Sequence, residues 1–334
     1  MLWEYAIDAG SEEMRLVKRG DAGILREPSY TAVRAGRDTP FAWGERALKI
    51  KNRAPEGVKV YKLVKRGCPA RADLFGVWAR SVVDENTEVL TRKNVLFASS
   101  AFMREEEKEE IEKRLIDEGF QAVGTVKGIL AAALGAGENI MDSECTLVCD
   151  VGAEQITMAV ISGGRIVKSE AVPSGASVVP ERLYESIREN LACAVSEESV
   201  MSMIRDWQAG TADEFEKSVF DYRTGFPAKK KISASFAAEA VMELSKTVLN
   251  ALEKLLLFLP EELAGDITRK GITLTGGGAR FSGMESYLKE KLNLPVRTAE
   301  TPERCVSKGL LRILNSQKTY QALVEDEMEA VRRP

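Results

Sequence analysis

Apolar positions along the chain fall into short continuous runs and longer stretches with helical spacing. The first run, residues 5–10, predicts a buried strand that ends in an acidic turn. Residues 14–18 predict a second strand so soon after it that the two must form a hairpin. A further buried strand is expected over 94–99, and amphipathic helices over 71–83 and 104–118.

The second half of the chain repeats this opening. Residues 145–152 predict a buried strand ending in Asp150-Val151-Gly152, and two more strands follow over 156–161 and 166–171. Both halves therefore begin with a strand, an Asp-x-Gly turn and a returning strand, which indicates an internal duplication of topology. Helices are expected over 181–192, 237–259 and 281–292, and 306–331 is expected to be mostly helical.

Composition narrows the chemistry that the chain can perform. Its 334 residues suffice for two domains, and none of them is histidine. Ser-His-Asp and Cys-His catalysis and every histidine-dependent zinc site are therefore excluded. The formal net charge of −4 gives no reason to expect nucleic acid as a partner. The N-terminus does not resemble a signal peptide and no apolar run is long enough to span a bilayer, so a cytoplasmic location is expected.

Three turns combine small residues with groups suited to binding an anion. The first loop begins Asp8-Ala9-Gly10-Ser11, the second loop begins Asp150-Val151-Gly152, and the third turn is Thr275-Gly276-Gly277-Gly278. Glycine lets backbone amides approach a phosphate closely, and an aspartate can hold a divalent metal through water. One Asp-x-Gly turn alone is commonplace. Three such turns in this order predict a phosphate-binding cleft.

Two adjoining segments carry a family resemblance. Residues 259–267 (LPEELAGDI) and 269–279 (RKGITLTGGGA) resemble a segment of the MreB-type bacterial actins almost residue for residue. These proteins belong to the superfamily of actin, chaperone and sugar-kinase ATPases. Residues 131–137 (AAALGAG) and 224–227 (TGFP) support the resemblance, which covers nearly the whole chain.

The resemblance implies an actin-like ATPase fold of class α/β, in which two duplicated domains, each with a small subdomain, surround a central nucleotide cleft. Domain I is expected over 1–144, with its subdomain near 34–70. Domain II is expected over 145–312, with its subdomain near 182–236, and a C-terminal helix over 313–334 is expected to return to domain I.

The resemblance also implies cofactors and a function. It implies that Asp8 and Asp150 hold Mg²⁺ through water, and that ATP is held by Asp8, Gly10, Ser11, Asp150, Gly152, Thr275, Gly276, Gly277, Gly278 and Ala279. The implied function is ATP-dependent assembly into filaments that guide cell-wall synthesis and set cell shape. The implied partners are further copies of the chain or an actin-like paralogue, the inner face of the cytoplasmic membrane and the cell-wall elongation machinery.

Both phosphate loops depart from the family pattern. The first loop carries Glu12 and Glu13, which place carboxylates near the expected phosphates. The second loop has Ala153 and Glu154 where the family has glycines, so another carboxylate is added. Each unpaired like-charge contact costs on the order of 1 kcal/mol or more near a surface. Binding of ATP and Mg²⁺ therefore depends on what surrounds these glutamates.

The position that matches the family's water-positioning glutamate is Gly128. Glycine cannot orient or activate water, so slow or absent ATP hydrolysis is predicted. Two functions remain open: an ATP-binding, filament-forming actin with weak hydrolysis, or a nucleotide-independent scaffold or regulator that assembles with a normal paralogue. A sugar kinase would need a carboxylate base in the cleft, and a chaperone would need a peptide-binding domain; both are disfavoured.

The segment before residue 94 matches the family's membrane loop. It contains Val89 and Leu90, flanked by Arg92 and Lys93. Apolar insertion beside basic contacts to anionic lipid predicts membrane contact and a location at the membrane periphery. The alternative is that Val89 and Leu90 pack beneath their own loop.

Overall fold

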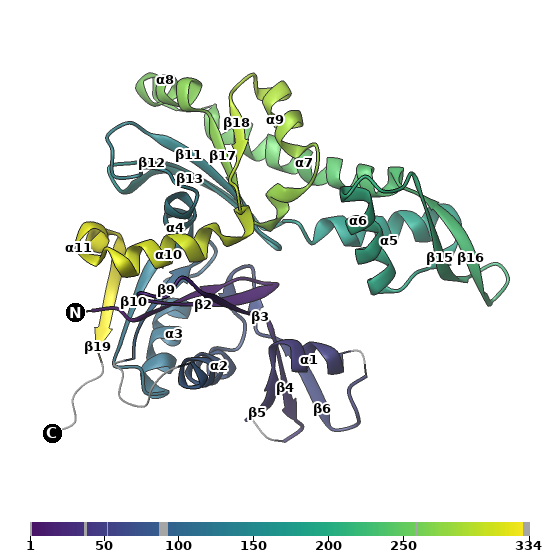
Figure 1. The fold of residues 1–334 in the computed structure, drawn as a ribbon, viewed down its shortest axis with the longest axis horizontal. Helices are drawn as coiled ribbons and strands as arrows, with labels where there is room; N and C mark the ends of the chain where they lie inside the picture. The colour runs from purple at the N-terminus through teal and green to yellow at the C-terminus, as the bar shows by residue number, and fades with distance from the viewer. Residues whose placement is uncertain (1, 37–38, 52, 87–92, 258, 330–334) are drawn as a thin grey trace.

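The computed structural model describes residues 2–36, 39–51, 53–86, 93–257 and 259–329. Two large sheets face each other across a central helical layer, and helices cover their outer faces (Figure 1). The helices are α1 Gly44–Lys51, α2 Ala72–Glu85, α3 Glu105–Asp117, α4 Gly128–Gly135, α5 Val178–Leu191, α6 Glu197–Gln208, α7 Ser235–Leu256, α8 Glu261–Lys270, α9 Met284–Leu292, α10 Cys305–Asn315 and α11 Gln317–Tyr320. The 3₁₀ turns are η1 Gly277–Arg280, η2 Pro302–Arg304 and η3 Gln321–Leu323.

The first large sheet has the strand order β19-β10-β9-β1-β2-β3. Its strands are β1 Tyr5–Ala9, β2 Glu13–Lys18, β3 Ile24–Pro28, β9 Asn94–Ser99, β10 Ala122–Lys127 and β19 Val324–Glu329. Strand β1 pairs antiparallel with β2 in the predicted hairpin and parallel with β9. Alternate residues of β1 face opposite ways: Tyr5 and Ile7 pack with α2 and α3, whereas Ala6 packs with α4 and α10.

The second large sheet has the strand order β13-β12-β11-β17-β18 and repeats the same plan. Its strands are β11 Thr146–Val151, β12 Ile156–Ser162, β13 Arg165–Val172, β17 Ile272–Thr275 and β18 Val296–Thr298. Strand β11 pairs antiparallel with β12 and parallel with β17, just as β1 pairs with β2 and β9. The duplicated topology expected from the sequence is therefore confirmed.

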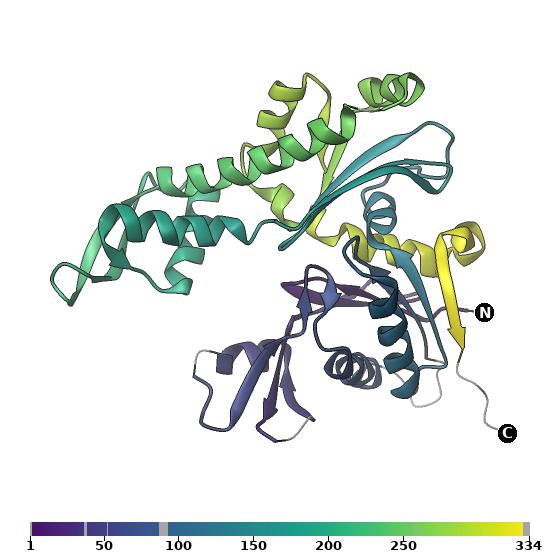
Figure 2. The same cartoon turned by 180° about the vertical axis from the view of Figure 1, so that it is seen from behind.

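A smaller unit accompanies each large sheet. The first contains the sheet β5-β4-β6 (Pro40–Trp43, Tyr30–Arg34, Val58–Lys62) with α1, followed by the hairpin β7-β8 (Val64–Lys65, Cys68–Pro69). The second contains the sheet β14-β15-β16 (Cys193–Ala194, Glu214–Asp221, Phe226–Ser233) with α5 and α6. Seen from behind, both units project on the same side of the molecule (Figure 2).

Helices α4 and α10 form the layer between the two large sheets. One apolar cluster joins residues of both helices to Ala6 of the first sheet and Val148 of the second. The helices cross at glycines, because a Cβ at Gly135 would lie 1.7 Å from the carbonyl oxygen of Cys305, and one at Gly309 would lie 1.8 Å from that of Ala131. The two helices therefore pack backbone to backbone at the centre of the molecule.

The expectation of a C-terminal helix over 313–334 is met only by the end of α10, by the short α11 and by η3, and it is wrong for residues 324–329. Helix α10 ends at Asn315, and residues 324–329 form β19, which pairs antiparallel with β10. The acidic sequence of β19 (VEDEME) favours a helix or a loop on local grounds. The open edge of β10 overrides that preference by supplying ladder hydrogen bonds, and β19 becomes the edge strand of the sheet.

Candidate functional site

A cavity of about 640 Å³ lies between the two large sheets. This central cavity is lined by residues of all three predicted turns: Asp8, Gly10, Ser11, Asp150, Gly152, Gly276, Gly277 and Gly278, together with Gly128. Thr275 and Ala279 are buried behind its wall and do not line it. The volume lies within the range of about 300–1,000 Å³ that small-molecule sites occupy.

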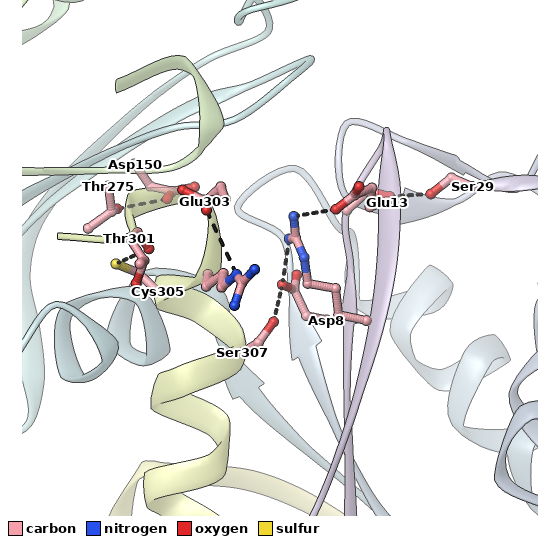
Figure 3. A network of polar contacts seen from close by, with 12 residues as sticks. Asp8, Glu13, Ser29, Asp150, Thr275, Thr301, Glu303, Cys305 and Ser307 are labelled. Atoms are coloured by element: carbon pink, nitrogen blue, oxygen red, sulfur yellow. Dashed lines mark hydrogen bonds and ion pairs between the residues drawn. The ribbon is translucent and has the colours of Figure 1, made fainter. Parts of the chain in front are cut away.

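Asp8 reaches the central cavity because of strand alternation. It occupies the same face of β1 as Ala6, the face that packs toward α10. Its Oδ2 accepts a hydrogen bond from the hydroxyl of Ser307 on α10, 3.0 Å away (Figure 3). The same oxygen lies 3.3 Å from Nη1 of Arg15, its register partner on β2. The carboxylate is therefore fixed by two partners at the floor of the cavity.

Asp150 reaches the same space from the second sheet. It shares the face of β11 with Val148, which packs into the central layer. Its Oδ1 accepts a hydrogen bond of 2.7 Å from the Thr275 hydroxyl, on the side of the cavity opposite Asp8 (Figure 3). Burial raises the pKa of Asp150 to about 6, and the negative charge of Asp8 acts in the same direction. The Thr275 hydrogen bond favours the ionised form and opposes this rise.

The third turn packs against the second loop through its glycines. Gly276 has a φ of +83°, and a Cβ there would lie 2.4 Å from the carbonyl oxygen of Val151. A Cβ at Gly278 would lie 2.5 Å from a methyl carbon of Val151. Gly277, in contrast, has no such close neighbour and lines the cavity. Glycine at 276 and 278 therefore serves close packing, and Gly277 leaves its backbone open toward a ligand.

Each glutamate that departs from the family pattern has a cationic partner. Nζ of Lys62, at the end of β6, lies 2.7 Å from Oε1 of Glu12 and 2.6 Å from Oε1 of Glu154. Arg15 Nη2 lies 2.9 Å from Oε2 of Glu13. Burial opposes ionisation of Glu154, but Lys62 and the Arg66 backbone N–H outweigh it and lower the pKa of Glu154. The three glutamates therefore lie in the cavity wall as members of ion pairs, not as unpaired charges.

Gly128 is the first residue of α4 and lines the central cavity. A Cβ at this position would lie 3.2 Å from the carbonyl oxygen of Ser99, so a side chain would begin at the cavity wall. The neighbouring Lys127 pairs with Glu325 of β19, with Nζ and Oε1 3.1 Å apart. No carboxylate projects from the position that resembles the family's catalytic one.

Among the polar residues in or beside the cavity that the sequence analysis did not identify are Arg15, Lys62, Thr157 and Ser307. Arg15 could have been found, because it lies on the hairpin strand opposite Asp8 and shares its face. Thr157 likewise lies opposite Asp150 on β12, lines the cavity, and has a buried hydroxyl with no hydrogen-bond partner in the described structure. Such an orphaned polar atom fits a site that receives a polar ligand.

The donor set fits a nucleotide better than a metal ion alone. Within the described residues, no three Cys, Asp or Glu side chains lie close enough together to hold a metal ion. Asp8 and Asp150 supply two carboxylates, so a magnesium ion here would take its other ligands from water and phosphate oxygens.

Two other sequence expectations concern the membrane. Val89 and Leu90 lie outside the described residues. Among the helices that the structure describes, none combines the length and apolar character needed to cross a bilayer.

Comparison with known proteins gives the family directly. The profile of the MreB/Mbl protein family matches residues 3–322. The chain is 25% identical over 312 residues to the cell shape-determining protein Mbl of Bacillus cereus, with 92% of this chain and 94% of the relative covered. It is 26% identical over 328 residues to the cell shape-determining protein MreB of Escherichia coli K12, with 92% and 91% covered.

Solved structures share the fold. The structure of MreB 5 of Spiroplasma citri bound to AMPPNP superposes with a TM-score of 0.86 at 23% identity, covering 95% of this chain and 96% of the other. The double helical filament of MamK gives a TM-score of 0.77 at 15% identity, covering 93% and 98%. The chain therefore belongs to the MreB/Mbl family of actin-like, cell shape-determining proteins.

Proposed function

We propose that this chain is a bacterial actin that binds ATP in the central cavity, assembles into filaments and hydrolyses ATP slowly or not at all. Binding of nucleotide is supported by the related MreB 5 of Spiroplasma citri, whose structures hold AMPPNP and ADP. Assembly is supported by MamK, whose structure is a double helical filament. The proposed role is to guide cell-wall synthesis and thereby set cell shape.

The observation that carries this proposal is the convergence of three turns on one cavity. Asp8 and Asp150 approach it from two different sheets, and Gly277 faces it from the third turn. The open glycine backbone suits phosphate oxygens, and the orphaned Thr157 hydroxyl offers one further polar contact. We propose that the nucleotide-binding residues are those of the three turns: Asp8, Gly10 and Ser11 of the first, Asp150 and Gly152 of the second, and residues 275–279 of the third. In this proposal Mg²⁺ accompanies the nucleotide through water on Asp8 and Asp150.

Slow hydrolysis follows from Gly128, which offers no side chain to position water. Replacing it by glutamate, Gly128→Glu, restores a carboxylate at the first turn of α4, where a negative charge also suits the helix dipole. We expect the rate of phosphate release to rise by on the order of tenfold or more, because general-base assistance is typically worth about 10²–10⁴. Gly128→Gln is the matched control, since it adds the same bulk without the charge.

Phosphate release from purified protein measures this directly. The proposal of slow hydrolysis would be contradicted if the wild type hydrolyses ATP as fast as an ordinary bacterial actin and if Asp150→Asn abolishes that activity. Equal rates for Gly128→Glu and Gly128→Gln would show that the missing carboxylate is not what limits turnover.

The ion pairs of Lys62 favour a second candidate. They connect Glu12 of the first loop to Glu154 of the second through one protein side chain, so the protein itself supplies a link between the two halves of the site. A nucleotide-independent scaffold or regulator, alone or assembled with a paralogue, would behave in this way. Electron microscopy of the purified protein separates the two candidates. Filaments that need ATP support the first, and filaments indifferent to ATP support the second.

We also propose, from the family resemblance, that the protein lies at the inner face of the cytoplasmic membrane and works with the cell-wall elongation machinery. The predicted contact is the loop of Val89 and Leu90. The double variant Val89→Glu/Leu90→Glu is expected to lose co-flotation with anionic vesicles, because insertion would bury two carboxylates. Val167→Glu is the control, since Val167 is an exposed apolar residue on β13. Unchanged flotation of the double variant would exclude this loop.

A further inference from the structure

Three aromatic side chains are exposed at one end of the second small unit. Phe220 is 46% exposed, Tyr222 51% and Phe226 70%, and all three lie at the turn end of the β15–β16 hairpin. The rings of Phe220 and Tyr222 meet edge to face, with centroids 6.0 Å apart. We call these three residues the aromatic tip. Exposed aromatic groups gathered in one place are typical of a surface that binds another molecule.

The charges beside the aromatic tip disfavour a lipid membrane as its partner. Lys229, Lys230 and Lys231 of β16 each pair with an acidic residue of β15, at N–O distances of 3.0–3.3 Å. Arg223, in the turn, is exposed and forms no ion pair with the residues that the structure describes. Attraction to anionic lipid relies on clusters of basic residues, whereas a single arginine suits a protein surface with a few carboxylates.

The chain carries a matching surface where α7 ends and α8 begins. Leu257, directly after α7, is 72% exposed. Glu253 lies one turn earlier on α7, and Glu261 and Glu262 begin α8. All three glutamates are exposed, and none of the described residues forms an ion pair with them. This α7–α8 junction therefore complements the aromatic tip, because an apolar side chain and free carboxylates would meet aromatic rings and a free arginine.

The two surfaces lie at opposite ends of the second half of the molecule. Helix α7 follows the hairpin and leads into the junction, and both views show the helix between them (Figures 1 and 2). Its 22 residues make it about 33 Å long, so the two surfaces do not meet within one copy. A contact between two different surfaces of neighbouring copies is heterologous, and such a contact repeats into a ring or an open filament.

We propose that the aromatic tip of one copy binds the α7–α8 junction of the next, and that this contact joins the copies of a filament. The inference rests on the proposed assembly into filaments and names the surfaces that this assembly uses. Phe226 and Leu257 are the apolar anchors of the contact, and Arg223 meets the carboxylates of the junction.

Pelleting of purified protein measures the critical concentration, above which filaments form. ATP is present or absent according to what the wild type requires. Phe226→Glu and Leu257→Glu are each expected to raise the critical concentration by about tenfold or more, the usual effect of losing a buried anchor of an interface. Met242→Glu is the matched control and is expected to assemble as the wild type does, because Met242 is 38% exposed on α7 between the two surfaces. Thermal unfolding verifies that each variant is folded.

A mixture of the two variants tests whether the contact is head to tail. Phe226→Glu keeps an intact junction and Leu257→Glu keeps an intact tip, so one productive contact remains between one copy of each. At concentrations well above the critical concentration of the wild type, each variant alone is expected to sediment as a monomer in analytical ultracentrifugation. The equimolar mixture is expected to sediment as a heterodimer that does not grow further.

Filaments of either variant at the critical concentration of the wild type would overturn this inference and leave the proposed assembly in place. A mixture that stays monomeric would overturn it as well. If Phe226→Glu assembles normally but no longer co-floats with anionic vesicles, the aromatic tip binds membrane and the inference is wrong. A wild type that forms no filaments with or without ATP would overturn both this inference and the proposed assembly.

Discussion

Replacing Asp150 by asparagine is predicted to stabilise the ligand-free protein. The pKa of this carboxyl is raised to about 6 from an ordinary value of 3.8, chiefly because the group is desolvated. The folded state therefore disfavours its ionised form. Asparagine removes the charge, keeps nearly the same shape and retains an oxygen that accepts the hydrogen bond from Thr275.

The pKa shift sets the size and the pH window of the effect. A rise of about two pKa units corresponds to about 3 kcal/mol of lost stability, and this is an upper bound because Asp150 is partly exposed to the cavity. The penalty is complete above pH 6. It decreases as the pH falls from 6 to 3.8 and is absent below that, where the carboxyl is protonated in both folded and unfolded states.

Differential scanning calorimetry of Asp150→Asn and wild type, without nucleotide, measures the effect. At pH 7.5 we expect the variant to unfold several degrees higher, and the difference should shrink as the pH approaches 4. Asp266→Asn is a control of opposite sign. The backbone N–H of Cys145 lowers the pKa of Asp266 and thus stabilises its charge, so this variant should not gain stability at pH 7.5.

Two results would refute this reasoning. One is an Asp150→Asn protein that is less stable than the wild type at pH 7.5. The other is a stability difference that does not change between pH 4 and pH 7.5, which would mean that ionisation of Asp150 is not its source. If Asp150→Asn is more stable but no longer binds nucleotide, the charge of Asp150 is retained for function at the expense of stability.

Two further perturbations test the frame around the cavity. Gly309→Ala should lower the free energy of unfolding by about 2 kcal/mol or more, because its Cβ would lie 1.8 Å from a main-chain oxygen of α4. Calorimetry measures this against the control Gly265→Ala, whose Cβ would have open space in α8. Equal stability of the two variants would contradict the close crossing of α4 and α10. Lys62→Met should cost about 1 kcal/mol at pH 7 by removing the partner of Glu154, whose pKa is lowered. A lowered pKa contributes its full stability above the unfolded pKa of 4.5, and this contribution is lost as the pH falls through the folded pKa of Glu154. The difference should therefore disappear on acidification below that folded pKa, with Lys49→Met as an exposed control. A difference that is constant with pH would exclude the ion pair as its cause.

Local sequence determined the strands and turns that build the cavity. The apolar runs of β1 and β11 alternate so that Asp8 and Asp150 share a face with Ala6 and Val148, and both aspartates consequently point into the layer between the sheets. The spacing of strand, turn and returning strand likewise predicted the duplication, because a short connection leaves only a hairpin. These features depend on neighbours a few residues away.

The limits of the sequence are clearest at β19 and at Lys62. Residues 324–329 are a strand only because β10 presents an unpaired edge about 200 positions earlier in the chain. Glu12 and Glu154 looked like repulsive charges in isolation, and their common partner Lys62 comes from a different sheet. Hydrophobic periodicity records which face of an element is buried, whereas ion pairs and sheet edges depend on which distant segments meet in space. For this protein, the sequence therefore determined the frame of the cavity, and only the tertiary structure decided the charge inside it.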